Sequence, residues 1–322
     1  MSEMQDAAGK AASPKKSRFW WWLGGAVVVV ALVWSIAVCV LLGIASGLST
    51  PSLPAGGDAV AVIYIEGSIG VSSAGGGTVN HTEVLDFVQQ ANENNRVKAI
   101  VVYINSPGGT VVPSDEMYRA LSASDKPVVA AMGDIAASGG YYIACGADKI
   151  VAHPATITGS IGVYGQLVNA ADLLEELGVE GIIVRSGDSK AVGNWFEHPT
   201  EEQLAIEQAI VDDLYDLFVR SVAEGRDLDE DVVRSLADGR PYLGQQAVDL
   251  GLVDELGNLD HAVALAGEMG GIEGEPRVID YISPPSLLEI WLLSQSSARG
   301  EVALLEWLSS QYVIPQMRYI GP

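Results

Sequence analysis

The sequence predicts an α/β fold, a mainly parallel sheet with helices between its strands, preceded by one N-terminal transmembrane helix. From about residue 59 onward, short apolar runs rich in β-branched residues alternate with runs of helical spacing, as in strands joined by crossover helices. Two glycine-rich turns each follow a predicted strand, so both belong at the carboxyl edge of the sheet. Residues 19–48 contain no charged side chain, and this stretch is long enough for one membrane span.

The N-terminal part predicts a membrane anchor with a cytoplasmic end. Residues 1–18 are basic, which by the positive-inside rule keeps them in the cytoplasm and places the rest of the chain outside. A cleaved signal peptide is the alternative, because residues 45–47 are small. The apolar run is, however, far longer than the roughly 7–15 residues of a signal-peptide core. We therefore expect a retained single-pass anchor, residues 19–48, in the cell membrane.

The remaining elements are predicted in chain order from their periodicity and their boundary residues. Residues 49–57, rich in Pro, Gly and Ser, form a linker. Strands are predicted at residues 59–65, 97–104, 127–132, 149–152 and 181–184. Helices are predicted at residues 82–92, 114–121 with Ser114 as the cap, 141–145, 170–177, 200–224, 228–237 and 261–269. Thr200 and Gln203 form a capping box for the longest of these helices.

These elements place one catalytic domain at residues 58–276 and a separate C-terminal segment at residues 277–322. That segment mixes Leu, Ile and Trp with a few charges. We expect it to pack against another subunit or the membrane surface, and a frayed tail is the alternative.

Composition narrows the classes of partner. The formal net charge is −23 and the sequence pI about 4.3, which makes nucleic acids and anionic lipid surfaces unsuitable partners. Only two cysteines occur, Cys39 in the apolar run and Cys145 after it. An intramolecular disulfide and a cysteine-based metal site are therefore not expected, and no metal or organic cofactor is implied.

The most informative stretch, residues 133–145, presents one hydroxyl among small residues. Ser138 stands between two alanines and two glycines, at a predicted turn from strand to helix. Small neighbours allow a substrate backbone to approach, and the helix N-terminus offers free N–H groups to a developing negative charge. This arrangement suits the nucleophile of acyl transfer. The alternative is a helix start with Ser138 as its N-cap.

A serine nucleophile needs a base, and two residues compete for that role. Among the four histidines only His153, at the end of a predicted strand, is well placed, although no acid is positioned to orient it. Of the four lysines beyond the apolar run, Lys190 alone lies in a polar loop that follows a strand. A lysine base has to be neutral, which an apolar pocket favours and the nearby Asp188 carboxylate opposes. The residues themselves leave both assignments open.

The turn at residues 105–109 supplies candidate oxyanion donors. Its consecutive glycines allow backbone N–H groups to point into a cleft without side-chain obstruction. Gly139, directly after Ser138, offers another amide.

Several motifs together resemble the signal peptide peptidase A family, short form, which is serine protease family S49 of the ClpP/crotonase-like fold. They are Asn-Ser-Pro-Gly-Gly at 105–109, Ala-Ala-Ser-Gly-Gly-Tyr-Tyr at 136–142, Ala-Asp-Lys-Ile-Val at 147–151, Thr-Gly-Ser-Ile-Gly-Val at 158–163, the loop 186–190, and the stretches 237–242 and 244–255. The resemblance covers residues 60–266 in unbroken order. It implies a domain of stacked ββα units.

Carried over residue by residue, the resemblance implies roles for five positions. Ser138 would be the nucleophile, Lys190 the general base and Ser160 the hydroxyl that orients the lysine amine, while the amides of Gly109 and Gly139 would form the oxyanion hole. The family also implies a homo-oligomer in which neighbouring subunits complete the active sites. Lys190 follows Ser138 by 52 residues, which suits a base from a later loop, including that of an adjacent subunit.

The expected function is that of a membrane-anchored serine endopeptidase that degrades cleaved signal peptides or similar hydrophobic peptides at the membrane. With neutral Lys190 as base, its activity would rise toward alkaline pH. One alternative is a related membrane Ser-Lys protease that cuts membrane-associated partner proteins. Others are a crotonase-type acyl-CoA enzyme, which the external location disfavours, and a catalytically silent scaffold, which the presence of both Ser138 and Lys190 disfavours.

Overall fold

The computed structural model describes residue 34, residues 57–70 and residues 78–282. All of the predicted anchor except residue 34, almost all of the predicted linker and most of the predicted C-terminal segment lie outside these ranges. Within the described ranges, no helix combines the length and the apolar character that crossing a bilayer requires.

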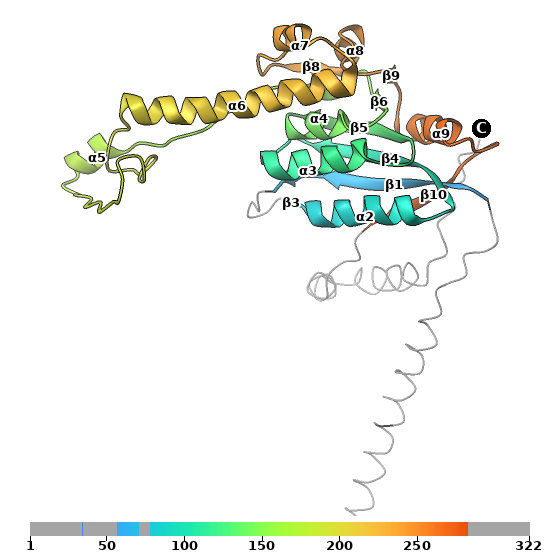
Figure 1. Ribbon diagram of the computed structural model, residues 1–322, viewed down its shortest axis with the longest axis horizontal. Coiled ribbons are helices and arrows are strands. Elements are labelled where there is room, and N and C mark those ends of the chain that lie inside the picture. The colour runs from blue at the N-terminus through green and yellow to red at the C-terminus, as the bar shows by residue number, and fades with distance from the viewer. Residues whose placement is uncertain (1–33, 35–56, 71–77, 283–322) are drawn as a thin grey trace, which may run out of the picture. The chain divides into compact units, whose positions relative to one another are not determined.

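A parallel sheet forms the centre of the domain, as predicted. Its main strands lie in the order β10 (Arg277–Tyr281), β1 (Ala59–Glu66), β4 (Val97–Ser106), β5 (Val128–Ala137), β6 (Lys149–Ala152) and β9 (Glu255–Leu256), and every pairing along this path is parallel (Figure 1). The central strands are apolar along nearly their whole length because both of their faces are covered. The predicted α/β class with a parallel sheet is confirmed.

Helices cover both faces of the sheet and create two apolar cores. On one face, α2 (His81–Glu93), α3 (Val111–Ser122) and α4 (Gly139–Ala144) pack against side chains such as Ile63 of β1 and Ile100 of β4. On the other face, α9 (Leu259–Met269) packs against the alternate residues, such as Val62 and Val101. Successive strand residues point to opposite faces, so each strand contributes to both cores.

The strand β5 changes partner along its length, and this change positions its end. Val129 to Met132 pair with β6, whereas Ile135 to Ala137 pair with β7 (Ile157–Gly159). β7 in turn pairs antiparallel with β8 (Pro241–Leu243). A two-stranded sheet, β2 (Ser68–Ile69) and β3 (Thr78–Val79), lies beside the turn at Gly109 through an isolated bridge from Ile69. Because β4 pairs with Ala136 from the other side, the carboxyl end of β5 is held between two strands.

The remaining helices include one that projects from the sheet body. α7 (Glu230–Leu236) and α8 (Gly244–Asp249) lie near one end of α6 (Glu201–Arg226), and α5 (Ala171–Glu176) lies near its other end, away from the sheet (Figure 1). We refer to residues 164–210, which include α5 and the start of α6, as the arm. Between Gly162 and Leu217, the single buried residue is Gln203.

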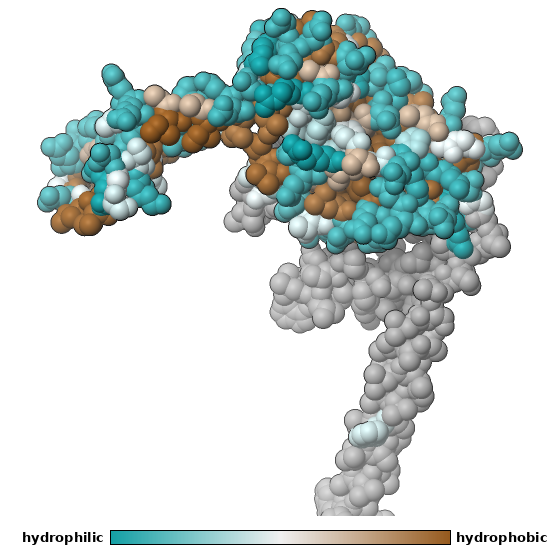
Figure 2. Space-filling view, viewed as in Figure 1, coloured by the Kyte–Doolittle hydropathy of each residue, from teal (hydrophilic) through white to brown (hydrophobic). Residues whose placement is uncertain are grey.

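The arm exposes many large apolar side chains. Ile182 is 85% exposed, Val184 94% and Tyr164 86%. Figure 2 shows hydrophobic surface along the projecting part of α6 and at the α5 end. Isolated monomers rarely leave so much contiguous apolar surface in water.

Several predicted boundaries need correction. The strand predicted at residues 181–184 does not form, because these residues lie in the arm beyond the reach of any described strand. The helix predicted at 114–121 begins at Val111, so Thr110 occupies the N-cap position and Ser114 is buried inside the helix. The strand predicted at 127–132 continues to Ala137. Residues 277–281, at the start of the predicted C-terminal segment, pair with β1 as β10.

Candidate active site

Ser138 lies at the junction of β5 and α4, in a conformation that few non-glycine residues adopt. Its φ is 52° and its ψ −121°. Its amide donates to the carbonyl of Gly159 at 2.8 Å, and its own carbonyl accepts from the amide of Tyr142 at 2.8 Å. Backbone of this kind costs free energy and persists where the surrounding structure enforces it, which is common at functional sites. The alternative reading of Ser138 as a capping side chain finds no hydrogen bond to support it.

Ser160 shares this unusual backbone and faces the same cavity. Its φ is 51°, and it follows directly after β7, the strand that pairs with the end of β5. Its amide donates to the carbonyl of Arg240 at 3.0 Å, which fixes it from the side of β8. Within the described residues, the non-glycine residues with positive φ are Ser138, Ser160 and Asp227. Two of these three strained positions are predicted site residues.

Two adjoining cavities open at Ser138. One, of about 750 Å³, is lined by Ser138, Ser160 and Gly109 together with residues of α6, including Val211 and Tyr215. The other, of about 550 Å³, has a more apolar wall that contains Val111, Tyr142, Leu214 and Phe218 beside Ser138 and Gly139. The two glycine-rich turns therefore meet at one place, as their positions after successive strands predicted.

The amides of Gly109 and Gly139 have no hydrogen-bond partner in the described part of the chain. In the bridge between Ile69 and Gly109, the hydrogen bonds run from the Ile69 amide to Gly108 and from the Thr110 amide back to Ile69. Gly139 is the first residue of α4, so its amide has no acceptor within the helix. Two free N–H donors thus flank Ser138, an arrangement that suits a developing oxyanion.

Glycine is required at this turn because the two backbone segments approach closely. A Cβ at Gly108, where φ is +100°, would lie 2.6 Å from the amide nitrogen of Gly139 and 2.9 Å from Ser138 Cβ. A Cβ at Gly109 would lie 2.0 Å from the carbonyl oxygen of Ile69. The sequence Gly-Gly is therefore what permits the turn to reach Ser138.

Tyr142 forms a support for the site that the sequence analysis did not identify. Its hydroxyl donates to Asp115 Oδ1 at 2.8 Å and accepts from Ser221 Oγ at 2.7 Å, which joins α3, α4 and α6. Burial of the ring raises the pKa of Tyr142, so its hydroxyl remains a donor at alkaline pH. Its spacing of four residues from Ser138, one helical turn, is the signal that could have pointed to it.

Lys190 does not meet Ser138 within one chain. It lies in the arm, is exposed, and lines neither of the two cavities at Ser138. Its amide donates to the carbonyl of Gly187 at 3.0 Å, which closes a turn, and its side chain makes no hydrogen bond or ion pair with any described residue. Asp188, whose carboxylate was expected to oppose a neutral lysine, forms no ion pair with it. The structure thus brings together four of the five predicted site residues.

His153, the competing base, lies in a different cavity. It is exposed, its Nδ1 accepts a hydrogen bond from the amide of Ala155 at 3.2 Å, and it shares a cavity of about 430 Å³ with Tyr64 and Tyr103. Ser138 does not line that cavity. Among the described residues, no three His, Cys, Asp or Glu side chains are grouped as a metal site requires.

Comparisons with known proteins show that the chain is similar to peptidases. The model of peptidase family S49 matches residues 120–273, and the Clp protease model matches residues 65–158. A protein of Synechocystis sp. that is named as a protease is 43% identical over 198 residues, 61% of this chain and 72% of that one. A protein of Enterococcus faecium that is named as a signal peptide peptidase SppA is 41% identical over 187 residues, 57% of this chain and 54% of that one.

A third relative extends the likeness to a longer protein. Protease 4 of Salmonella typhi is 34% identical over 237 residues, 70% of this chain but only 38% of that one. The domain is therefore Clp protease-like, and its parallel sheet agrees with that assignment. The chain belongs to peptidase family S49, the family of the signal peptide peptidase SppA.

Proposed function

We propose that this peptidase is a membrane-anchored serine endopeptidase in which Ser138 of one chain works with Lys190 of a neighbouring chain. The observation that carries the proposal is the pairing of a strained, half-buried serine with two unpaired amide donors, at the mouth of a cavity with an apolar wall. Within one chain, Lys190 does not line either cavity at Ser138. The arm that carries Lys190 exposes the apolar surface that contact with a second copy would cover.

The proposed chemistry follows the order of acyl transfer. Ser138 Oγ attacks the carbonyl carbon of the scissile peptide bond while Lys190 Nζ, in its neutral form, accepts the hydroxyl proton. The carbonyl oxygen becomes an oxyanion that the amides of Gly109 and Gly139 stabilise. Lys190 then returns the proton to the leaving amine, and water repeats the cycle on the acyl-enzyme. Ser160 orients the lysine amine by a hydrogen bond.

The substrate class is extended apolar peptide, with cleaved signal peptides as the proposed natural substrate. Val111, Leu214 and Phe218 line the cavity beside Ser138 and favour an apolar side chain there. The predicted anchor at residues 19–48 would hold the site at the membrane, on the side away from the cytoplasm, where such peptides are released.

The test is subunit complementation. Ser138→Ala and Lys190→Ala are each expected to abolish cleavage of a synthetic signal peptide by detergent-purified protein. When the two inactive variants are dissociated, mixed and reassembled, activity should return, because some neighbouring pairs combine an intact Ser138 with an intact Lys190. His153→Ala is the matched control and should retain the wild-type rate.

Other outcomes would contradict separate parts of the proposal. Full activity of Lys190→Ala would show that Lys190 is not the base. Loss of activity in His153→Ala would then identify His153 as the base. If both variants are inactive alone and remain inactive after mixing, although mass analysis shows mixed assemblies, the base does not come from a neighbour. Cleavage of folded partner proteins in preference to signal peptides would favour the alternative substrate class.

A further inference from the structure

Gln203 is an unusual residue in its surroundings. It is 8% exposed, and it is the only buried residue between Gly162 and Leu217, although this stretch contains many apolar side chains that stay in water. Burial of an amide costs free energy unless its polar atoms are hydrogen-bonded. The hydrogen bonds that Gln203 makes offset this cost.

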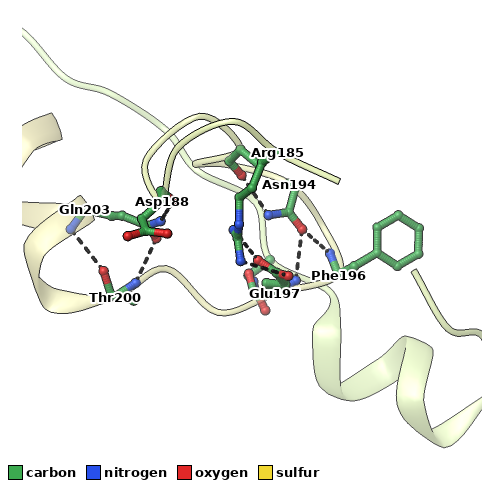
Figure 3. Close-up of polar contacts among 9 residues, drawn as sticks. Arg185, Asp188, Asn194, Phe196, Glu197, Thr200 and Gln203 are labelled. Atoms are coloured by element: carbon green, nitrogen blue, oxygen red, sulfur yellow. Dashed lines mark hydrogen bonds and ion pairs between the residues drawn. The ribbon is translucent and has the colours of Figure 1, made fainter. Parts of the chain in front are cut away.

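Two of those hydrogen bonds belong to the start of α6. Gln203 Oε1 accepts from the backbone amide of Thr200 at 3.0 Å, and the backbone amide of Gln203 donates to Thr200 Oγ1 at 3.2 Å (Figure 3). This is the capping box that the sequence predicted, and it satisfies N–H groups that have no partner within the helix. Glutamate at the same position would serve a capping box equally well.

The third hydrogen bond leads out of the helix to the loop of Lys190. Gln203 Nε2 donates to the carbonyl oxygen of Asp188 at 2.7 Å. Asp188 lies inside the turn that the Lys190 amide closes on Gly187, so the bond fixes the backbone two residues before Lys190. Capping does not need this contact, and only an amide or another donor at position 203 provides it.

A second amide fixes the backbone on the other side of Lys190. Asn194 Nδ2 donates to the carbonyl oxygen of Ala191 at 2.7 Å, and Asn194 Oδ1 accepts from the amides of Phe196 and Glu197, both at 2.9 Å. Arg185 closes the base of the loop by pairing with Glu197 at 2.7 Å (Figure 3). The backbone at Lys190 is thus held on both sides, while its side chain extends into solvent.

We infer that Gln203 is a positioning residue for Lys190, acting through its hydrogen bond to the carbonyl of Asp188. The inference rests on the proposed function, because a lysine presented to a neighbouring subunit gains from a fixed backbone. A base that is displaced by about 1 Å loses on the order of 10²-fold in rate, so holding the loop matters for turnover rather than for substrate binding.

Three variants separate positioning from capping. Gln203→Glu keeps the capping box and loses only the N–H donor to the Asp188 carbonyl. Gln203→Met loses the side-chain half of the capping box and that donor. Thr200→Ala loses one capping hydrogen bond but keeps the donor from Gln203 to Asp188. We expect Gln203→Glu and Gln203→Met to lower kcat by about 10- to 100-fold with little change in KM. Thr200→Ala should keep the wild-type kcat and show only a lower melting temperature.

A structural readout accompanies the kinetics. Hydrogen exchange of the Lys190 amide should accelerate in Gln203→Glu and Gln203→Met, and not in Thr200→Ala, with the mass of the assembled protein unchanged in all three variants. If Gln203→Glu turns over at the wild-type rate while Gln203→Met and Thr200→Ala are impaired alike, Gln203 only caps α6 and the inference is wrong. Lys190→Ala, measured in parallel, separates failure of the Gln203 inference from failure of the proposed function. If Lys190→Ala remains active, the assignment of Lys190 as the base fails as well.

Discussion

At the residue scale, the site depends on the absence of a side chain at Gly139. A Cβ there would lie 2.6 Å from Ser114 Oγ and 3.2 Å from the amide nitrogen of Gly109. Gly139→Ala should therefore push the two amide donors apart and lower kcat by about 10²-fold, as loss of an oxyanion donor does. Steady-state kinetics with a short apolar peptide would measure this.

The clash also predicts a specific rescue. Ser114→Ala alone removes a hydrogen bond to the Thr110 carbonyl and should leave kcat close to wild type. Combined with Gly139→Ala, it removes the nearer clash, so the double variant should be more active than Gly139→Ala. Strictly additive losses would show that Ser114 is not what the new methyl group meets.

Cys145 provides the residue-scale prediction on pH. Burial raises the pKa of its thiol from about 9.0 to about 12, so the native protein keeps a proton that the unfolded chain releases above the lower value. The free energy of unfolding should accordingly fall as pH rises from 9 toward 12. In a Cys39→Ser background, a thiol reagent at pH 8 should not label the native protein and should label it fully in denaturant. Rapid labelling of folded protein would contradict the burial.

Ser138, Gly109 and Gly139 were predictable together because they stand in glycine-rich turns that follow predicted strands at the same edge of one sheet. In the structure Ser138 and Gly139 follow β5, and Gly109 follows β4. Ser160 follows β7, a strand that was not predicted, so only the family resemblance pointed to it. Phe218 escaped prediction because its contribution depends on how α6 crosses α4, which no local pattern in the sequence encodes. Tyr142, in contrast, stands one helical turn after Ser138, and that spacing could have pointed to it. Lys190 lies in a loop, as predicted, but periodicity does not reveal that this loop belongs to the arm and not to the edge of the sheet.

At the scale of elements, strands were predicted well where a neighbour exists. Residues 149–152 formed β6 with the predicted bounds, since parallel neighbours satisfy its backbone on both sides. The similar apolar run at 181–184 formed no strand, because no described strand lies beside it. β5 ran past its predicted end through the polar Asp134, because β7 takes over the pairing from β6. Pairing partners, and not local pattern, decide these cases.

The junction of three helices at Tyr142 gives a prediction at this scale. Tyr142→Phe keeps the ring contacts with Tyr118 and Phe218 but removes the hydroxyl that joins α3 and α6 to α4. Ser221, which is buried, would lose its acceptor, so we expect a loss of about 1–3 kcal/mol in the free energy of unfolding. Urea unfolding would measure it, with Tyr164→Phe as the control because Tyr164 is 86% exposed. Equal stability of both variants would contradict the role of this junction.

At the scale of the whole molecule, the proposed function makes the arm of one chain and the site of its neighbour complementary parts of one active centre. The sheet and its covering helices hold Ser138 and the two amide donors, and the arm holds Lys190 on a backbone fixed by Gln203 and Asn194. A self-contained enzyme gains nothing from exposing Ile182 and Val184 almost fully to water. Assembly would cover these side chains, each worth about 1.5–3 kcal/mol when buried, and would deliver Lys190 to a neighbour in the same step.

Charged substitutions in the arm test this coupling of assembly and activity. Ile182→Asp and Val184→Asp are expected to leave the melting temperature of the isolated chain unchanged, because these side chains are 85% and 94% exposed and support nothing within it. Each substitution should lower the mass of the assembled protein in detergent, measured by sedimentation, and should abolish peptide cleavage at the same time. Val232→Asp, on α7 and 44% exposed, is the matched control and should affect neither. If the protein stays fully assembled and active with a charge at both positions, the apolar arm surface is not the contact between copies. If it dissociates and still cleaves peptide, one chain completes its own site.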